Sequence, residues 1–213
     1  ALTEQAQKLS LTSRAFYNSN LGEYEKKITL LFGFDKVLPM NSGAEAVETA
    51  IKLARKWSYE VKGIKDGYAK IIVCENNFHG RTTTIVSFSN DKDAHNNYGP
   101  FTPGFLRIPY NDIEALAKVL EDEAEHIAAF LVEPIQGEAG VYVPDEGYLK
   151  NASELCKKHN VLFVADEVQT GIARTGKLIA CHHENVQPDI LILGKALSGG
   201  MYPGSAVLAN DNS

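Results

Sequence analysis

Two short apolar runs, residues 161–165 and 190–193, constrain the fold of this chain more than any other feature. The first run stops at Asp166, and the second stops just before Gly194 and Lys195. Short apolar runs bounded by turn residues are typical of strands that are buried on both faces of a parallel sheet. In open α/β sheets, ligands bind at the carboxyl ends of such strands. We therefore expect Asp166 and Lys195 to lie on the same edge of one sheet.

Strand-like and helix-like segments alternate along the rest of the chain. Apolar runs rich in β-branched residues predict strands, and apolar residues at helical spacing predict helices. The expected strands cover residues 70–75, 84–88, 105–108, 127–134, 161–165, 190–193 and 204–209. The expected helices cover residues 22–32, a segment from a cap at 41 or 42 to 57, a segment from a cap at 111 or 112 to 123, and residues 145–159. This alternation predicts an α/β fold with a mainly parallel sheet flanked by helices.

Composition favours an ordinary globular protein and argues against nucleic-acid and membrane partners. The hydrophobic content is 44% and the charged content is 23%, while the net charge is −6 without a basic stripe. No apolar run approaches the roughly 18–20 residues that a membrane span needs. Cys74, Cys156 and Cys181 have no metal-ligand spacing, so we expect no metal site, and their odd number suits a reducing compartment.

Lys195 has the setting of a reactive lysine. It follows a buried strand in a turn rich in Ala, Ser and Gly, so its amine would be partly desolvated and more nucleophilic. Gly194, Gly199 and Gly200 let the backbone approach a ligand closely. A carboxylate at the matching position, Asp166, can keep a ring nitrogen protonated, and this pairing is what pyridoxal 5′-phosphate (PLP) chemistry needs. The spacing alone is equally compatible with a plain pair of structural strands.

Ser42, Gly43 and Ala44 open an expected helix and form a candidate anion site. The first amides of a helix lack intrahelical partners and favour an anion, and Gly43 lets the backbone close on it. An ordinary capped helix is the alternative. The chain has no P-loop and no dinucleotide fingerprint, which also argues against nucleotide hydrolysis by the acidic pair Asp166 and Glu167.

Further candidate residues follow two of the expected strands. Phe78, His79 and Arg81 follow the strand at 70–75, and each also has an ordinary explanation: a core aromatic, a satisfied structural histidine, and a surface or capping arginine. Glu133 and Glu138 are paired carboxylates. A metal or glycosidase site is not indicated, because neither a histidine partner nor a second acidic strand end is obvious.

Several motifs resemble those of the class III (ω-amino acid) aminotransferases, which are PLP-dependent enzymes of fold type I. The motifs are DEVQTG (166–171), RTG (174–176) and GKALSGG (194–200), and the resemblance extends across essentially the whole chain. TSRAFYN (12–18), LGEYE (21–25) and IPYND (108–112) are similar to the members that act on ornithine. The resemblance implies a fold type I large domain with a mainly parallel sheet.

The resemblance also implies roles for the candidate residues. The cofactor-binding set comprises Ser42, Gly43 and Ala44 at the PLP phosphate, Phe78 on the face of the ring, Asp166 at the pyridinium nitrogen, Gln169 at the phenolic oxygen, and Lys195, which forms the Schiff base and transfers the proton. Arg81 would bind the carboxylate of the substrate. Glu138 would act as a gate that pairs with an arginine of the C-terminal domain when ornithine binds.

The implied reaction transfers the δ-amino group of L-ornithine to 2-oxoglutarate. Its products are glutamate 5-semialdehyde, which cyclises to pyrroline-5-carboxylate, and glutamate. Acetylornithine or 4-aminobutyrate is the alternative amino donor, and a catalytically incomplete PLP-binding fragment is the alternative outside enzymes.

The resemblance further implies that residues 1–213 are the central PLP-binding large domain of a longer homodimeric enzyme, truncated at both ends and without the small C-terminal domain. No transit peptide is visible, so the cytoplasm is the expected location, with the mitochondrial matrix as the alternative.

Overall fold

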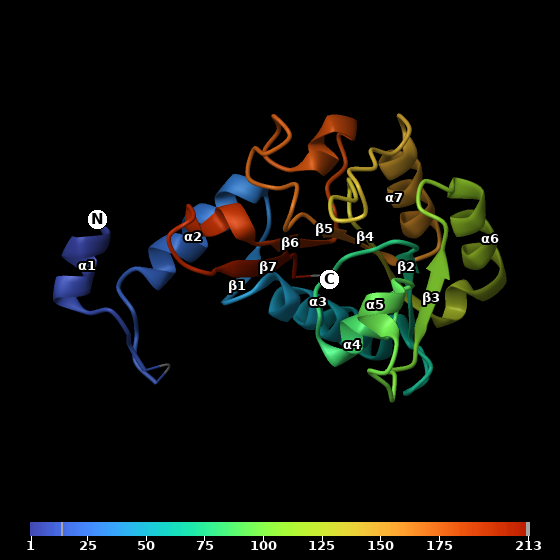
Figure 1. Ribbon diagram of the computed structural model, residues 1–213, viewed down its shortest axis with the longest axis horizontal. Helices are drawn as coiled ribbons and strands as arrows, with labels where there is room; N and C mark the ends of the chain where they lie inside the picture. Colours follow the sequence, from blue (N-terminus) through green and yellow to red (C-terminus); the bar gives the residue numbers. More distant parts are fainter. Residues whose placement is uncertain (14, 212–213) are drawn as a thin grey trace.

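A seven-stranded sheet organises the described residues, 1–13 and 15–211, of the computed structural model (Figure 1). Its strands are β1 (Lys36–Met40), β2 (Lys70–Cys74), β3 (Phe105–Ile108), β4 (Ile127–Val132), β5 (Leu162–Asp166), β6 (Ile190–Leu193) and β7 (Ser205–Ala209). The order across the sheet is β1-β7-β6-β5-β4-β2-β3. The strands from β6 to β3 pair in parallel, and β7 is antiparallel to both of its neighbours. The predicted α/β fold with a mainly parallel sheet is confirmed.

The described part of the chain also has seven α-helices and four short helical turns, and all but α1 and α2 lie between strands. The helices are α1 (Leu2–Lys8), α2 (Leu21–Phe32), α3 (Gly43–Trp57), α4 (Thr83–Val86), α5 (Lys92–His95), α6 (Ile113–Glu123) and α7 (Tyr148–Lys158), and the turns are η1 (Ser58–Lys62), η2 (Ala124–His126), η3 (Ala180–Glu184) and η4 (Lys195–Ser198). None of the described helices combines the length and apolar character needed to cross a bilayer. Arg14, from a family-like motif, and Asn212 and Ser213 lie outside the described residues.

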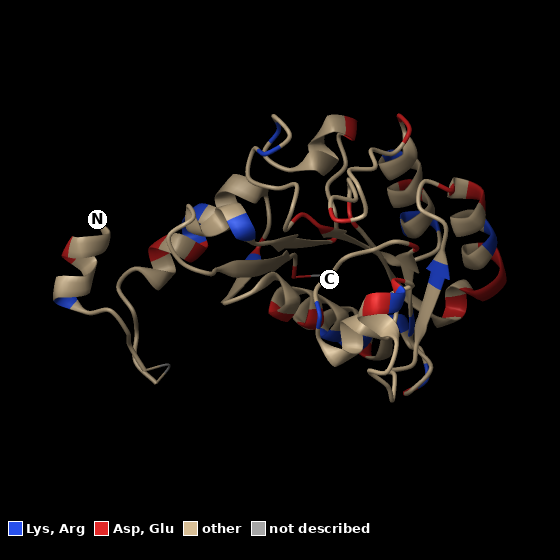
Figure 2. Ribbon diagram, viewed as in Figure 1, with Lys and Arg blue, Asp and Glu red and all other residues tan. Residues whose placement is uncertain are grey.

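Helices cover both faces of the sheet and create two apolar cores. Figure 1 shows α3 and α4 on one side of the strands and α7 on the other. Successive side chains of a strand point to opposite faces. In β6, Ile190 and Ile192 pack in the core beneath α3, whereas Leu191 and Leu193 pack in the core beneath α7. Figure 2 shows that charged residues concentrate on the helices and loops, while the middle of the sheet is largely uncharged.

The start of α3 is fixed by its own sequence. Ser42 is the N-cap, and its Oγ accepts the backbone N–H of Glu45 at 3.2 Å. The Glu45 carboxylate in turn accepts the backbone N–H of Ser42 at 2.7 Å, which completes a capping box. The helix therefore begins at Gly43, with its first amides directed beyond the strand ends.

Residues 84–88 and strand β1 differ most from the sequence expectation, and helices α1 and α5 were also not among the expected helices. The strand expected at 84–88 is wrong, because residues 83–86 form helix α4, whose Thr82 cap accepts the N–H of Ile85. Ile85 and Phe88 are buried in the core beneath α3, so their hydrophobicity reflects packing and not strand pairing. The segment 75–104 instead forms the crossover that a parallel β2–β3 pair requires. Strand β1 was not predicted; it is an edge strand, where Pro39 is tolerated.

The register of β5 and β6 fixes the functional edge. Asp166, the last residue of β5, pairs with Ile192, and Lys195 follows three residues later. Both side chains therefore lie at the carboxyl edge of two adjacent parallel strands, as the two apolar runs predicted.

Candidate active site

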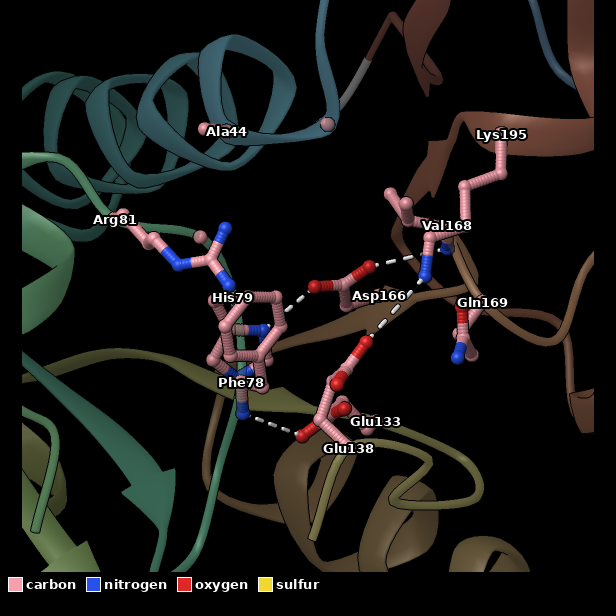
Figure 3. Close-up of a pocket in the computed structure, with 12 residues that line it drawn as sticks. Ala44, Phe78, His79, Arg81, Glu133, Glu138, Asp166, Val168, Gln169 and Lys195 are labelled. Atoms are coloured by element: carbon pink, nitrogen blue, oxygen red, sulfur yellow. Dashed lines mark hydrogen bonds and ion pairs between the residues drawn. The ribbon is translucent and has the colours of Figure 1, made fainter. Parts of the chain in front are cut away.

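A cavity of about 330 Å³ lies at this edge of the sheet. Its walls come from the start of α3 and from the segments that follow β2, β4, β5 and β6 (Figure 3). The lining residues are Gly43, Ala44, Phe78, His79, Gly80, Arg81, Glu133, Glu138, Asp166, Val168, Gln169 and Lys195. Eight of the nine residues expected from the sequence are among them. The ninth, Ser42, is the cap of α3 and does not line the cavity.

Asp166 and His79 form a buried pair. His79 Nδ1 lies 2.6 Å from Asp166 Oδ2, and Asp166 Oδ1 accepts the N–H of Val168 at 3.1 Å. Burial lowers the pKa of His79, but the hydrogen bond and charge of Asp166, together with the charge of Glu133, outweigh it and raise this pKa overall. The contact with Asp166 thereby favours the charged form of the imidazole.

Glu133 is a second buried carboxylate beside this pair. It follows β4, and its Oε2 accepts the backbone N–H of Phe78 at 3.0 Å (Figure 3). Burial raises the pKa of Glu133 to about 7; the charge of Asp166 adds to this rise, and that of His79 opposes it. The cavity thus has one carboxylate paired with an imidazole and a second carboxyl group whose pKa burial raises to about 7.

Lys195 reaches into the cavity from the turn after β6 (Figure 3). Its backbone φ is 40°, in the left-handed region that side chains other than glycine rarely adopt. Its Nζ lies 4.0 Å from Glu138 Oε1, and its side chain is 43% exposed. The amine is therefore accessible from the cavity and has a carboxylate beside it.

Val168 packs between the two glycines that flank the cavity. A Cβ on Gly43 would lie 3.0 Å from Val168 Cγ1, and a Cβ on Gly194 would lie 3.1 Å from the same atom. Both contacts are tighter than an ordinary van der Waals contact, so a side chain at either glycine would press against Val168. On another wall, a Cβ on Gly137 would lie 2.8 Å from Gln169 Cγ, so this glycine packs directly against Gln169.

The segment after β2 contributes the aromatic wall. The guanidinium of Arg81 lies 5.2 Å from the centre of the Phe78 ring, within the range of a cation–π contact. Gly80 has a φ of 128°, and a Cβ there would lie 2.8 Å from the Cβ of Ala44. Only glycine combines this backbone conformation with so close an approach to α3.

These residues fit PLP as a ligand. The N–H groups of Gly43 and Ala44 are at helix positions that have no intrahelical partner, which suits a phosphate. Phe78 and Val168 supply apolar walls for a ring, the buried Asp166 suits a protonated ring nitrogen, and the Lys195 amine suits an aldehyde.

Four lining residues were not among the nine expected ones. His79 had a structural explanation, Glu133 was noted as a strand-end carboxylate, and Gly80 and Val168 were not singled out. The available signal was position, since each lies at or just beyond the carboxyl end of an expected strand.

Comparisons with known proteins agree with this geometry. The family model described as Aminotransferase class-III matches residues 1–213. An ornithine aminotransferase of Drosophila ananassae, named as mitochondrial, is 64% identical over 211 residues, which cover 99% of this chain and 48% of that protein.

Two solved structures show the same similarity. Acetylornithine aminotransferase from Elizabethkingia anophelis is 75% identical with a TM-score of 0.86, and the match covers 99% of this chain and 49% of that chain. An ornithine aminotransferase from Toxoplasma gondii, described with partial occupancy of PLP at its active site, is 54% identical with a TM-score of 0.97 over 99% and 49% of the two chains. The chain spans about half the length of the curated relatives it matches.

Proposed function

The chain belongs to the class III aminotransferase family, and we propose that it is the cofactor-binding part of an enzyme that transfers the δ-amino group of L-ornithine to 2-oxoglutarate. The products would be glutamate and glutamate 5-semialdehyde, which cyclises to pyrroline-5-carboxylate. One observation carries the proposal: the Lys195 amine and the buried Asp166–His79 pair face the same cavity.

PLP is the cofactor of this family. When bound, it supplies an aldehyde that condenses with amines and a protonated ring that withdraws electrons from the attached carbon. The amides of Gly43 and Ala44 would bind the phosphate, and Ser42 fixes the helix start that presents them. Phe78 would contact the ring, and Gln169 its phenolic oxygen.

Asp166 and Lys195 are the residues proposed to hold and transfer protons. Asp166 would accept the ring N–H of bound PLP, and His79 holds this carboxylate in place through the 2.6 Å contact. Lys195 would hold the cofactor through its amine. The same amine, free when the substrate is bound, would move a proton at the substrate carbon as general base and then as general acid.

Arg81 and Glu138 select the substrate. The Arg81 guanidinium lines the cavity and suits a carboxylate, a fork-to-carboxylate pairing. Glu138 acts as the gate. In this structure its neighbouring cation is Lys195 at 4.0 Å, and an arginine from the C-terminal domain would be its partner when ornithine binds.

Acetylornithine is the second candidate amino donor. The observation that favours it is the 75% identity with the E. anophelis protein named for that substrate. The cofactor-binding residues of this chain serve either donor, so the difference lies in how Arg81 and Glu138 receive the far end of the substrate. 4-Aminobutyrate is a third donor of the same kind, and a PLP-binding fragment without turnover is the alternative outside enzymes.

A single-turnover assay on the full-length protein in its PLP form tests the proposal. L-ornithine or N-acetylornithine is added, the cofactor absorbance is followed, and pyrroline-5-carboxylate is trapped. Fast conversion by ornithine with trapped product supports the δ-transaminase. Preference for acetylornithine moves the protein to the second candidate. The Lys195→Ala variant is the control and should lose the absorbance of the lysine-bound cofactor.

The proposed enzyme works as a homodimer. Large apolar side chains are exposed on the N-terminal arm and on the turn after Lys195, including Leu11, Phe16, Tyr17 and Tyr202. Such surface suits a second copy of the chain. Sedimentation of the full-length protein tests this, and a monomer at micromolar concentration would contradict it.

The cytoplasm is the proposed compartment, with the mitochondrial matrix as the alternative. The name of the D. ananassae relative supports the alternative, whereas the names of the T. gondii and E. anophelis proteins carry no compartment. Imaging of the tagged full-length protein distinguishes the two.

A further inference from the structure

Two buried carboxylates hold two consecutive residues beside the cavity. Glu133 Oε2 accepts the backbone N–H of Phe78 at 3.0 Å, and Asp166 Oδ2 lies 2.6 Å from His79 Nδ1. The carboxylates come from neighbouring strands, because β4 lies between β5 and β2 in the sheet. Only 5% of Glu133 and 4% of Asp166 is exposed. The segment after β2 is therefore anchored at one backbone amide and at the side chain that follows.

A carboxylate is a costly choice for such an anchor. Burying it carries a large desolvation penalty unless hydrogen bonds compensate, and a loop amide can be satisfied by water or by a neutral acceptor. Among the described residues, the side chain of Glu133 has one hydrogen-bond donor, the N–H of Phe78. With a pKa of about 7, Glu133 is partly ionised at neutral pH, and in the ionised form this bond is charge-assisted and therefore shorter and stronger than a neutral one. The site thus uses a buried carboxyl group to hold the backbone of a single aromatic residue.

Further contacts restrict the same segment. Gly80 packs on the start of α3, where a Cβ would lie 2.8 Å from the Cβ of Ala44. The guanidinium of Arg81 lies 5.2 Å from the centre of the Phe78 ring. With its backbone anchored on both sides, the ring is held at the wall of the cavity that faces Lys195 and Gln169 (Figure 3).

We propose that Glu133 is a positioning residue that fixes the Phe78 ring through the backbone amide of Phe78. The proposal rests on the proposed function, in which this ring contacts PLP. Glu133 itself transfers no proton to the substrate; it sets where the ring stands, and the ring sets how tightly and in which orientation the cofactor is held.

The first test needs no cofactor. Amide hydrogen exchange at Phe78 is measured in the PLP-free full-length protein and in its Glu133→Ala variant. Loss of the acceptor should speed exchange at this amide on the order of 10-fold or more, because the hydrogen-bond acceptor of a backbone amide is removed. Glu125→Gln, at an exposed residue just before β4, is the control and should leave the rate unchanged. Equal exchange in the wild type and in Glu133→Ala overturns the proposal.

The second test asks whether Glu133 acts through the ring. The dissociation constant of PLP is measured for the wild type, Glu133→Ala, Phe78→Leu and the double variant. Leucine keeps the backbone amide but removes the ring. If Glu133 serves the ring, Glu133→Ala weakens binding on the order of 10-fold, and the double variant binds no more weakly than Phe78→Leu. If the losses of PLP affinity caused by Glu133→Ala and Phe78→Leu multiply in the double variant, Glu133 has a general structural role and the proposal is overturned.

Failure of the proposed function has a separate signature. A wild-type protein that binds no PLP contradicts the proposed function, whereas the exchange rate at Phe78 still decides whether Glu133 holds this segment. If Glu133→Ala does not fold, Glu133→Gln carries both measurements. It keeps the side-chain size and an acceptor oxygen without the charge, and it should give a smaller change in the same direction.

Discussion

Val168 fixes the distance between two backbone segments of the site. Its isopropyl group touches the backbone at Gly43, where α3 begins, and at Gly194, just before Lys195. One side chain therefore sets the separation between the amides proposed to hold the phosphate and the lysine proposed to hold the aldehyde. The absence of a Cβ at both glycines follows from this packing.

A methyl group at position 194 should disturb this spacing. Gly194→Ala places a Cβ 3.1 Å from Val168 Cγ1, and overpacking of this kind costs about 1–3 kcal/mol of unfolding free energy. Val168→Ala in the same chain removes the contacted atoms and should recover most of that loss. Chemical denaturation of the three variants measures it. Gly22→Ala is the matched control, because a Cβ there meets nothing within 4 Å. An equal loss with and without Val168 would contradict the packing argument.

Glu133 should make stability depend on pH. Its pKa is about 7 in the fold and 4.5 ordinarily, because burial opposes its charge. The folded state therefore binds more protons than the unfolded state between these values, and the unfolding free energy falls as pH rises through this window. Glutamine does not titrate, so the Glu133→Gln variant should not lose stability in this window. Its unfolding free energy relative to that of the wild type should therefore rise from about pH 4.5 to 7, by up to about 3 kcal/mol.

Urea unfolding at several pH values checks this expectation, with Glu125→Gln as the control. The titratable groups that interact with Glu133 are His79 and Cys74 from the β2 side, Tyr110 after β3, Asp166 at the end of β5 and Lys195 after β6. A difference between Glu133→Gln and the wild type that stays constant with pH would show that this carboxyl group does not titrate in the window.

The position of a site residue could be predicted from the sequence only where the pattern around that residue was local. Asp166 and Lys195 could be predicted because each ends its own apolar run. The roles of His79 and Glu133 could not, because each arises from a contact across strands; His79 and Asp166 are 87 positions apart in sequence. The role of Val168 was equally invisible, since it depends on two glycines from distant segments.

At the scale of elements, Lys62 joins η1 to the start of β4. Its ammonium donates to the carbonyl groups of Ala124 at 2.8 Å and Ile127 at 2.7 Å. Burial lowers the pKa of Lys62 to about 8, so this lysine loses part of its solvation to make the contacts. The helical unit α3–η1 is thereby tied to the strand that carries Glu133.

Removing the hydrogen bonds of the Lys62 ammonium should lower the unfolding free energy. Lys62→Met keeps the length of the side chain but leaves the two carbonyl groups without their donor, and it should cost about 2 kcal/mol of unfolding free energy at pH 7. Thermal and urea unfolding measure the change. Lys52→Met, at an exposed position of α3, should be neutral. If both variants unfold alike, the tie contributes nothing to stability.

Strong local patterns predicted most elements, and the exceptions have physical causes. The buried strands β2, β4, β5 and β6 were predicted because a run of apolar residues suits a strand covered on both faces. Residues 84–88 have the same composition, yet they form one helical turn because Thr82 caps it and Ile85 packs beneath α3. Short apolar runs do not distinguish these outcomes. Strand β1 is half-exposed and contains a proline, so its sequence gave no strand signal.

At the scale of the whole molecule, the site lies near exposed apolar surface that another part of the protein or a second copy could cover. The arm formed by residues 1–13 and 15–20 extends from the body in Figure 1, and α1 has no buried residue. Met201 and Tyr202, near Lys195, are about 70% exposed. Glu138 has a carboxylate turned to the cavity, with Lys195 as its neighbouring cation. Both the surface and the site therefore have room for elements supplied by a longer chain or by a second copy.

This arrangement predicts that residues 1–213 expressed alone show no steady transaminase turnover. The cavity supplies the groups for the cofactor, but the gate at Glu138 lacks the arginine that the proposed mechanism assigns to it, and the exposed apolar side chains favour self-association. The isolated chain should still bind PLP, more weakly than the full-length protein, and form a lysine-bound cofactor that Lys195→Ala abolishes. Turnover of L-ornithine with 2-oxoglutarate, followed by the pyrroline-5-carboxylate formed, checks this expectation on both proteins. Sustained turnover by the isolated chain would show that its own residues complete the site, and Glu138 would then need no partner from outside residues 1–213.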